Sequence, residues 1–192
     1  MGKWLARWIL ERAGWKIDSG APPEKRFVLV CAPHTSNWDF LYFILIITFV
    51  GVKISWIGKH VLFAPPLGWI MRRLGGIPVE RRLRGDVVSR MTRIFAEREE
   101  FALAIAAEGT RSRTSHWRSG FYHIARAANV PVVPGYLDYS RRRGGFGPAI
   151  YLTGDIPHDM DGFREFFADK VGRHPEKFGE VRLREEMLSD ER

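Results

Sequence analysis

Cysteine is almost absent from this 192-residue chain, in which Cys31 stands alone. A single cysteine excludes an internal disulfide and any cysteine-based zinc cluster, and it allows a reducing compartment without requiring one. Cys31 lies within the apolar run Phe-Val-Leu-Val-Cys-Ala. We therefore interpret it as a small buried side chain rather than as a nucleophile.

Long apolar runs are also missing. The longest run, residues 40–52, is interrupted by Thr48 and ends near Gly51, and it is shorter than the roughly 20 residues that a membrane-spanning helix needs. We interpret it as a buried helix.

The amino-terminal segment lacks the features of two common targeting signals. Arg7, Glu11 and Arg12 interrupt what would have to be an apolar stretch in a secretory signal, and Ala6 stands where a myristoylation signal has serine or threonine. We therefore expect a cytoplasmic protein, with peripheral attachment to the cytoplasmic face of a membrane left open.

Cofactor and metal motifs are missing as well. Residues 51–59 have the wrong spacing for a phosphate loop, and the glycines at 144, 145 and 147 do not form a dinucleotide fingerprint. No cluster of histidine and acidic residues has the spacing of metal ligands. We expect no bound cofactor and no metal.

Acidic residues are outnumbered by basic ones. Thirty lysines and arginines oppose 22 aspartates and glutamates, which gives a formal net charge of +8. Such a charge predicts an anionic partner, such as a phosphate-bearing lipid, an acyl carrier or a nucleic acid, without choosing among them. The apolar content of 45% is ordinary for one globular domain.

The apolar pattern predicts an α/β fold with a single domain, built on a mostly parallel central sheet flanked by helices. An amphipathic helix within residues 1–20 precedes the domain at 21–175, and a charged tail at 176–192 follows it, of which the last dozen residues are expected to fray. Residues 22–26 and 141–147 resemble linkers. Strands are expected at 27–31, 53–57, 76–79, 101–107, 130–136 and 149–153, and helices at 40–50, 66–74, 86–100, 120–129 and 161–171.

The strongest chemical signal is His34 followed five positions later by Asp39, directly after an apolar strand. Five positions on a helix are about 500° of rotation, so the two side chains can meet only across a turn. A helix that begins near Asp39 would keep the carboxylate ionised and let it hold one imidazole nitrogen, while the other nitrogen takes a proton. The pair alone also fits a helix cap beside a packed histidine.

Four segments in order and spacing resemble the glycerolipid acyltransferase family, which includes the lysophosphatidic acid acyltransferases of phospholipid synthesis. They are His-Thr-Ser-Asn-Trp-Asp at 34–39, Gly-Gly-Ile-Pro-Val-Glu-Arg at 75–81 (preceded by Gly-Lys-His-Val-Leu-Phe at 58–63 and Pro-Leu-Gly at 66–68), Glu-Gly-Thr-Arg-Ser-Arg at 108–113, and Val-Pro-Val-Val-Pro at 130–134.

The resemblance implies an O-acyltransferase that moves a fatty acyl group from acyl-CoA or acyl carrier protein to a glycerolipid or lysophospholipid hydroxyl. It makes His34 the general base and Asp39 its orienting partner. Acceptor and phosphate binding falls to Arg81, Glu108, Gly109, Thr110 and Arg111, with Lys59 and Arg113 as secondary candidates.

Arginine suits a phosphate because its planar guanidinium binds two oxygens and stays charged. For Glu108 an ion pair with one of the arginines is the competing structural interpretation. Ala106 and Ala107 replace the usual Phe-Pro before the third segment, and Pro78 replaces an aromatic residue in the second. These differences leave the acceptor headgroup open.

Two stretches mix aromatic and basic residues, as interfacial membrane binders do. They are the first helix, with Trp4 and Trp8, and residues 56–73. The helix at 40–50 is expected to line the core or a tunnel for the acyl chain. One rival interpretation is a nucleic-acid-binding module that uses Arg-Arg-Arg-Gly-Gly-Phe-Gly at 141–147. Another is a catalytically weak paralogue that binds lipid or a partner.

Overall fold

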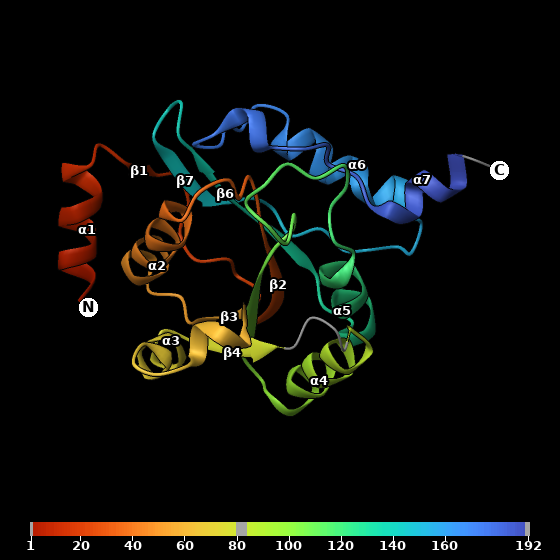
Figure 1. Cartoon of the computed structure of the whole chain (residues 1–192), viewed down its shortest axis with the longest axis horizontal. Helices are drawn as coiled ribbons and strands as arrows, with labels where there is room; N and C mark the ends of the chain where they lie inside the picture. The colour runs from red at the N-terminus through yellow and green to blue at the C-terminus, as the bar shows by residue number, and fades with distance from the viewer. Residues whose placement is uncertain (1, 80–83, 191–192) are drawn as a thin grey trace.

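A seven-stranded sheet runs through the computed structural model, which describes residues 2–79 and 84–190 (Figure 1). Neighbouring strands are parallel throughout, except that β7 runs antiparallel to β6. The order across the sheet is β1 (Lys16–Ile17), β7 (Arg143–Phe146), β6 (Val132–Asp138), β2 (Arg26–Cys31), β5 (Phe101–Ala106), β3 (Ile54–Lys59) and β4 (Gly76–Val79). The fold class predicted from the sequence is confirmed.

Helices cover both faces of this sheet (Figure 1). One face carries α2 (Trp38–Val50), with α1 (Lys3–Arg12) packed on its outer side. The other face carries α4 (Arg84–Glu97), α5 (Gly120–Ala128) and α6 (Ile156–Phe167). The remaining helical segments are η1 (His60–Phe63), α3 (Gly68–Arg73), η2 (Pro175–Lys177) and α7 (Arg184–Asp190).

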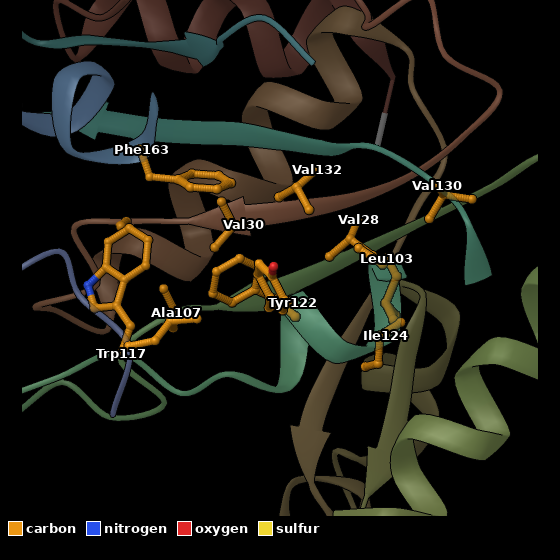
Figure 2. Packing of buried hydrophobic residues seen from close by; sticks show 14 of the residues in the cluster. Val28, Val30, Leu103, Ala107, Trp117, Tyr122, Ile124, Val130, Val132 and Phe163 are labelled. Atoms are coloured by element: carbon orange, nitrogen blue, oxygen red, sulfur yellow. The ribbon is translucent and has the colours of Figure 1, made fainter. Parts of the chain in front are cut away.

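Large side chains fill the face covered by α4, α5 and α6 (Figure 2). Val30 and Leu103 project from the central strands β2 and β5, and they meet Tyr122 of α5, Phe163 of α6 and the buried ring of Trp117. Each of these side chains is fully buried or nearly so. This densely packed half gives the sheet a rigid support.

On the opposite face of the sheet, the central strand β5 carries small side chains. In β5 the sequence Phe-Ala-Leu-Ala-Ile-Ala alternates, so that Ala102, Ala104 and Ala106 share one face while Leu103 and Ile105 share the other. The alanines lie on the face covered by α2. Because they fill less volume than leucine or isoleucine, space remains between the sheet and this helix.

Helix α1 is amphipathic, as predicted, but its tryptophans do not form the packed side. Ala6 and Leu10 are buried against α2, whereas Trp4 is 76% exposed and Trp8 is 49% exposed. Trp4 and Trp8 each lie two positions from Ala6, which is about 200° around the helix. Because Ala6 packs on α2, both tryptophans face outward. Among the described residues, none of the helices combines the length and apolar character needed to cross a bilayer.

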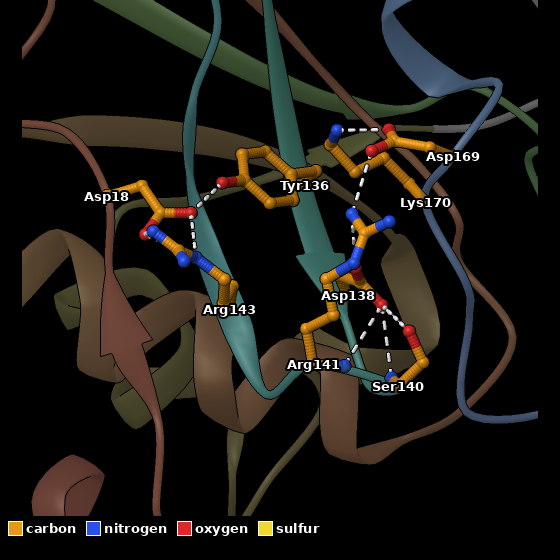
Figure 3. Close-up of polar contacts among 8 residues, drawn as sticks. All are labelled: Asp18, Tyr136, Asp138, Ser140, Arg141, Arg143, Asp169 and Lys170. Atoms are coloured by element: carbon orange, nitrogen blue, oxygen red, sulfur yellow. Dashed lines mark hydrogen bonds and ion pairs between the residues drawn. The ribbon is translucent and has the colours of Figure 1, made fainter.

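Residues 141–147 are not a linker. They contain the turn and strand of a β6–β7 hairpin (Figure 3), in which Gly144 and Gly145 pair with Leu137 and Tyr136. The predicted strand at 149–153 is wrong, because beyond β7 the pairing is reduced to a single bridge between Ile150 and Val132. Pro148 lies between the two stretches and offers no backbone N–H to continue the ladder.

The carboxyl-terminal segment packs on the domain, so the prediction that it frays is wrong as far as Met187. Leu183 is fully buried, its backbone N–H donates to Glu186 at 2.6 Å, and Glu186 pairs with Arg164 of α6 at 2.8 Å. Helix α6 itself begins five residues before the predicted start, because Asp155 caps its first turn by accepting the N–H of His158.

Candidate active site

The turn between β2 and α2 holds His34 and Asp39 together, as the sequence predicted. The strand ends at Cys31, and Asp39 lies in the first turn of α2. Nδ1 of His34 is 3.2 Å from Oδ2 of Asp39. An acidic partner at Nδ1 favours the tautomer with its proton on that nitrogen, so Nε2 keeps its lone pair.

Asp39 is a buried carboxylate with several donors around it. The backbone N–H groups of Thr35 and Ser36 both donate to Oδ2 at 2.8 Å, and the hydroxyl of Tyr139 donates to Oδ1 at 2.7 Å. Burial by itself raises the pKa of Asp39, but the contacts with His34, Ser36 and Tyr139 outweigh it and hold the pKa below its usual range. The carboxylate therefore stays ionised beside His34.

Tyr139 escaped the sequence analysis, because it lies 100 residues from Asp39 along the chain and belongs to none of the four motif segments. It follows β6, the strand beside β2, so the sheet brings it to the dyad. Burial, and then its bond to Asp39, raise the pKa of Tyr139. The hydroxyl thus remains protonated and fixes the carboxylate from the side opposite the loop amides.

Glu108 binds the loop that carries His34 and, among the described residues, does not pair with an arginine. Its Oε2 accepts the backbone N–H of His34 at 2.7 Å, and the residue is 1% exposed. Burial raises the pKa of Glu108 to about 8; the N–H of His34 lowers it in part, and the negative charge of Asp39 raises it further. Among the residues that the structure describes, no arginine lies within ion-pair distance of it.

Glu108 should make the stability of the protein depend on pH. An unfolded glutamate ionises near pH 4.3, whereas the folded one ionises near 8, so the raised pKa destabilises the fold progressively as pH rises through that window and by a constant amount above it. Glu108→Gln cannot ionise. We expect its free energy of unfolding, relative to that of the wild type, to rise on the order of 2–4 kcal/mol between pH 4.5 and pH 8.5.

Urea unfolding at these two pH values measures the effect, with Glu97→Gln, an exposed position on α4, as the matched control. Parallel pH profiles for the wild type and Glu108→Gln would show that the buried carboxyl titrates normally.

A cavity of about 610 Å³ opens beside the dyad and extends under α2. His34 and Asp39 lie on its wall. Its apolar walls come from α2, through Phe43 and Ile47, and from the sheet face with Ala104. The cavity has the size typical of small-molecule sites, and its apolar interior suits a hydrocarbon chain.

Most of the predicted binding residues lie along this cavity. Gly109, Thr110 and Arg111 line it from the loop after β5, and Lys59 lines it from the end of β3. Arg113 is exposed and is not part of the lining, and Arg81 lies outside the described residues.

Cys31 also borders the cavity, but its chemistry is suppressed. Burial raises the pKa of the thiol to about 12, and the nearby charge of Asp39 raises it further. A thiol in this state is a poor nucleophile at neutral pH, in agreement with its interpretation as a small apolar side chain. Within residues 2–79 and 84–190, no cluster of three or more histidine, cysteine and acidic side chains is arranged to hold a metal ion.

Comparisons with known proteins agree with this geometry. A family model described as Acyltransferase matches residues 17–138. The structure is similar to the crystal structure of 1-acyl-sn-glycerophosphate (LPA) acyltransferase PlsC from Thermotoga maritima, with a TM-score of 0.57 and 16% sequence identity over 85% of this chain and 73% of that one. No curated protein gives a significant sequence match. Because the family model covers more than half of its length, the chain belongs to the acyltransferase family, as the four motif segments predicted.

Proposed function

We propose that this acyltransferase moves a fatty acyl group from acyl-CoA or acyl carrier protein to a hydroxyl of a glycerolipid, with a lysophospholipid as the preferred acceptor. The observation that carries the proposal is the His34–Asp39 pair on the wall of an apolar cavity whose rim bears Arg111 and Lys59. The dyad supplies a base, the apolar interior accepts an acyl chain, and the basic rim attracts a phosphate.

In the proposed reaction Nε2 of His34 takes the proton of the acceptor hydroxyl as its oxygen attacks the thioester carbonyl. The carbon–oxygen bond forms, a tetrahedral intermediate collapses, and the carbon–sulfur bond breaks. The imidazolium then returns its proton to the departing thiolate. The products are the free thiol and the ester, and His34 is again neutral. Asp39 stabilises the imidazolium through Nδ1. The reaction needs only the two substrates and the dyad.

A direct test measures acyl transfer from palmitoyl-CoA and from palmitoyl acyl carrier protein to a panel of lysophospholipids, glycerol phosphates and neutral glycerolipids, with mass spectrometry of the products. The expected result is a new ester with a phosphate-bearing acceptor. Ester formed only with neutral acceptors would overturn the assignment of Arg111 and Lys59 to a phosphate. No ester from any pair would favour a catalytically weak paralogue that binds lipid.

The preference of the enzyme for long acyl donors should depend on the size of the side chain at the floor of the cavity. Ala104 lies in the middle of β5 beneath α2, and Ala104→Leu adds bulk to this floor. We expect kcat/KM for a palmitoyl donor to fall at least about tenfold, since several methylenes lose their place, while a hexanoyl donor stays within about threefold. Steady-state assays with donors of graded length measure this shift.

Leu103→Ile is the matched control, because residue 103 belongs to the same strand but faces the packed half of the core. It conserves volume and should leave the chain-length profile unchanged. Equal losses with short and long donors in Ala104→Leu would place the acyl chain elsewhere.

Peripheral membrane binding on the cytoplasmic face is also part of the proposal. Exposed apolar side chains gather on α1, on η1 and on α3, and basic residues accompany them. The apolar members are Trp4, Leu5, Trp8, Val61, Leu62, Leu67 and Trp69. Val61 and Leu62 also line the cavity, so contact there would let a lipid enter from the bilayer. Failure to float with vesicles that contain phosphatidylglycerol would overturn this part.

The rival nucleic-acid module receives little support from its own motif. Arg141 pairs with Asp169 at 2.7 Å, and Arg143 pairs with Asp18 (Figure 3). Arginines that already hold carboxylates have less charge to offer a nucleic-acid backbone.

A further inference from the structure

A second, smaller cavity of about 380 Å³ lies between the end of α1, helix α2 and the turn of the β6–β7 hairpin. We name it the arginine pocket because three arginines line it. Its lining residues are Arg12, Arg142, Arg173, Trp15, Tyr42, Tyr139 and Ala13. The three arginines are exposed, whereas the three rings are buried or half-buried and pack on one another. The pocket therefore has an aromatic interior and a guanidinium rim.

The arginines of this rim form no ion pairs among the described residues. In the chain as described, residues 2–79 and 84–190, none of the three lies within ion-pair distance of a carboxylate. Arg12 lies over the ring of Trp8, Arg173 lies over the rings of Trp38 and Tyr139, and Arg142 donates weakly to a backbone carbonyl. Three like charges gathered without counter-charges repel one another and attract an anion.

The neighbours of Arg142 show that this arrangement is not a general feature of the turn. Figure 3 shows Arg141 and Arg143, on either side of it, held by Asp169 and Asp18. The residue that points to the pocket is the one that lacks a carboxylate partner among the described residues.

The backbone at Arg142 adds a second, independent observation. Its φ angle is +50°, in the left-handed region where glycine is favoured and a side chain costs about 1 kcal/mol. Its carbonyl accepts the N–H of Lys16, so the conformation is fixed by the pairing of β1. A glycine would fit this position with less strain, so the backbone conformation does not account for an arginine there.

We propose that the arginine pocket binds the phosphate group of an anionic lipid at a site separate from the catalytic cavity. Guanidinium groups bind phosphate oxygens in pairs. Trp8 and Trp38, about half exposed beside Arg12 and Arg173, supply the amphipathic rings found at membrane interfaces. These rings favour a lipid headgroup over a soluble phosphate.

The pocket also reaches the dyad. Tyr139 lines it with its ring, while its hydroxyl holds Asp39. A bound headgroup would thus restrict the motion of Tyr139, the residue that positions the carboxylate of Asp39. The binding proposal itself does not rest on the proposed acyl transfer, because it is read from equilibrium binding.

Isothermal titration calorimetry tests the proposal with two probes, dihexanoyl phosphatidic acid and inorganic phosphate. Arg142→Gly removes the guanidinium and relieves the backbone, so we expect affinity for the lipid to fall about tenfold while the melting temperature stays unchanged or rises. Arg173→Gln should weaken binding by a similar factor. Arg93→Gln, an exposed arginine on α4, is the control and should bind as the wild type does.

Arg111→Gln separates this site from the catalytic cavity. It removes a cation of the catalytic cavity, so any lipid binding that it abolishes belongs to that cavity, whereas the binding that is lost in Arg142→Gly should persist in Arg111→Gln. Loss of binding in Arg111→Gln but not in Arg142→Gly would place the phosphate in the catalytic cavity and overturn the proposal. No binding of either probe would also overturn it. Equal affinity for both probes would support a phosphate site but overturn a lipid as its ligand.

Discussion

Replacing His34 with alanine is expected to reduce kcat/KM for acyl transfer by about a thousandfold, since Nε2 of His34 is the atom proposed to take the proton of the attacking hydroxyl. General-base catalysis by a positioned histidine contributes about 10²–10⁴-fold in enzymes. The variant should fold normally, because His34 is partly exposed and its backbone N–H, which Glu108 holds, is retained. Single-turnover assays of ester formation by mass spectrometry measure the loss.

His158→Ala, an exposed histidine on α6, serves as the control and should keep full activity. A His34→Ala protein that retains more than about a tenth of the wild-type rate would remove His34 from the mechanism, and the base would have to be sought elsewhere along the cavity.

Asp39→Asn is expected to damage both activity and stability. The amide replaces one carboxylate oxygen by an NH₂ group, which would face donors from Thr35 and Ser36 or from Tyr139. Donors left without an acceptor in this buried place should cost about 2–4 kcal/mol of the free energy of unfolding. Because a neutral amide cannot stabilise the imidazolium, kcat/KM should fall about 10²–10⁴-fold.

Urea unfolding and steady-state kinetics measure the two effects separately. Asp161→Asn is the control, because Asp161 forms an exposed pair with Arg164, and such pairs contribute less than about 1 kcal/mol. If Asp39→Asn were as stable as Asp161→Asn, the hydrogen bonds to this carboxylate would not hold the loop. If it were stable and fully active, Asp39 would have no part in orienting His34.

The local parts of this protein could be read from its sequence. The strand, turn and helix around residues 27–50 follow from apolar runs and from a five-residue spacing that excludes a common helical face, so the dyad was predictable. The order of the four motif segments was enough to predict the family. The alternation of alanine with leucine and isoleucine in β5 can also be seen in the sequence. The cavity that results under α2 cannot, because it forms only when α2 packs on the assembled sheet.

Other features depend on contacts between segments distant in the chain. Tyr139 reaches Asp39 because β6 lies beside β2, and Glu108 reaches the His34 amide because β5 lies on the other side of β2. The same is true in part of β7, which forms a local hairpin with β6 but also pairs with β1, far earlier in the chain. Strand order and helix orientation are set by which surfaces bury the most apolar area together, and no short window of sequence contains both surfaces.

The sequence by itself therefore determined the pairing of His34 with Asp39, the alternating strands and the family, because these depend on short segments and their spacing. Only the tertiary structure decided that the tryptophans of α1 face outward and that three arginines from separate segments share one pocket. The physical reason is that side chains far apart in the chain acquire their neighbours, and with them their pKa values and exposure, only when the sheet and its helices close around a common core.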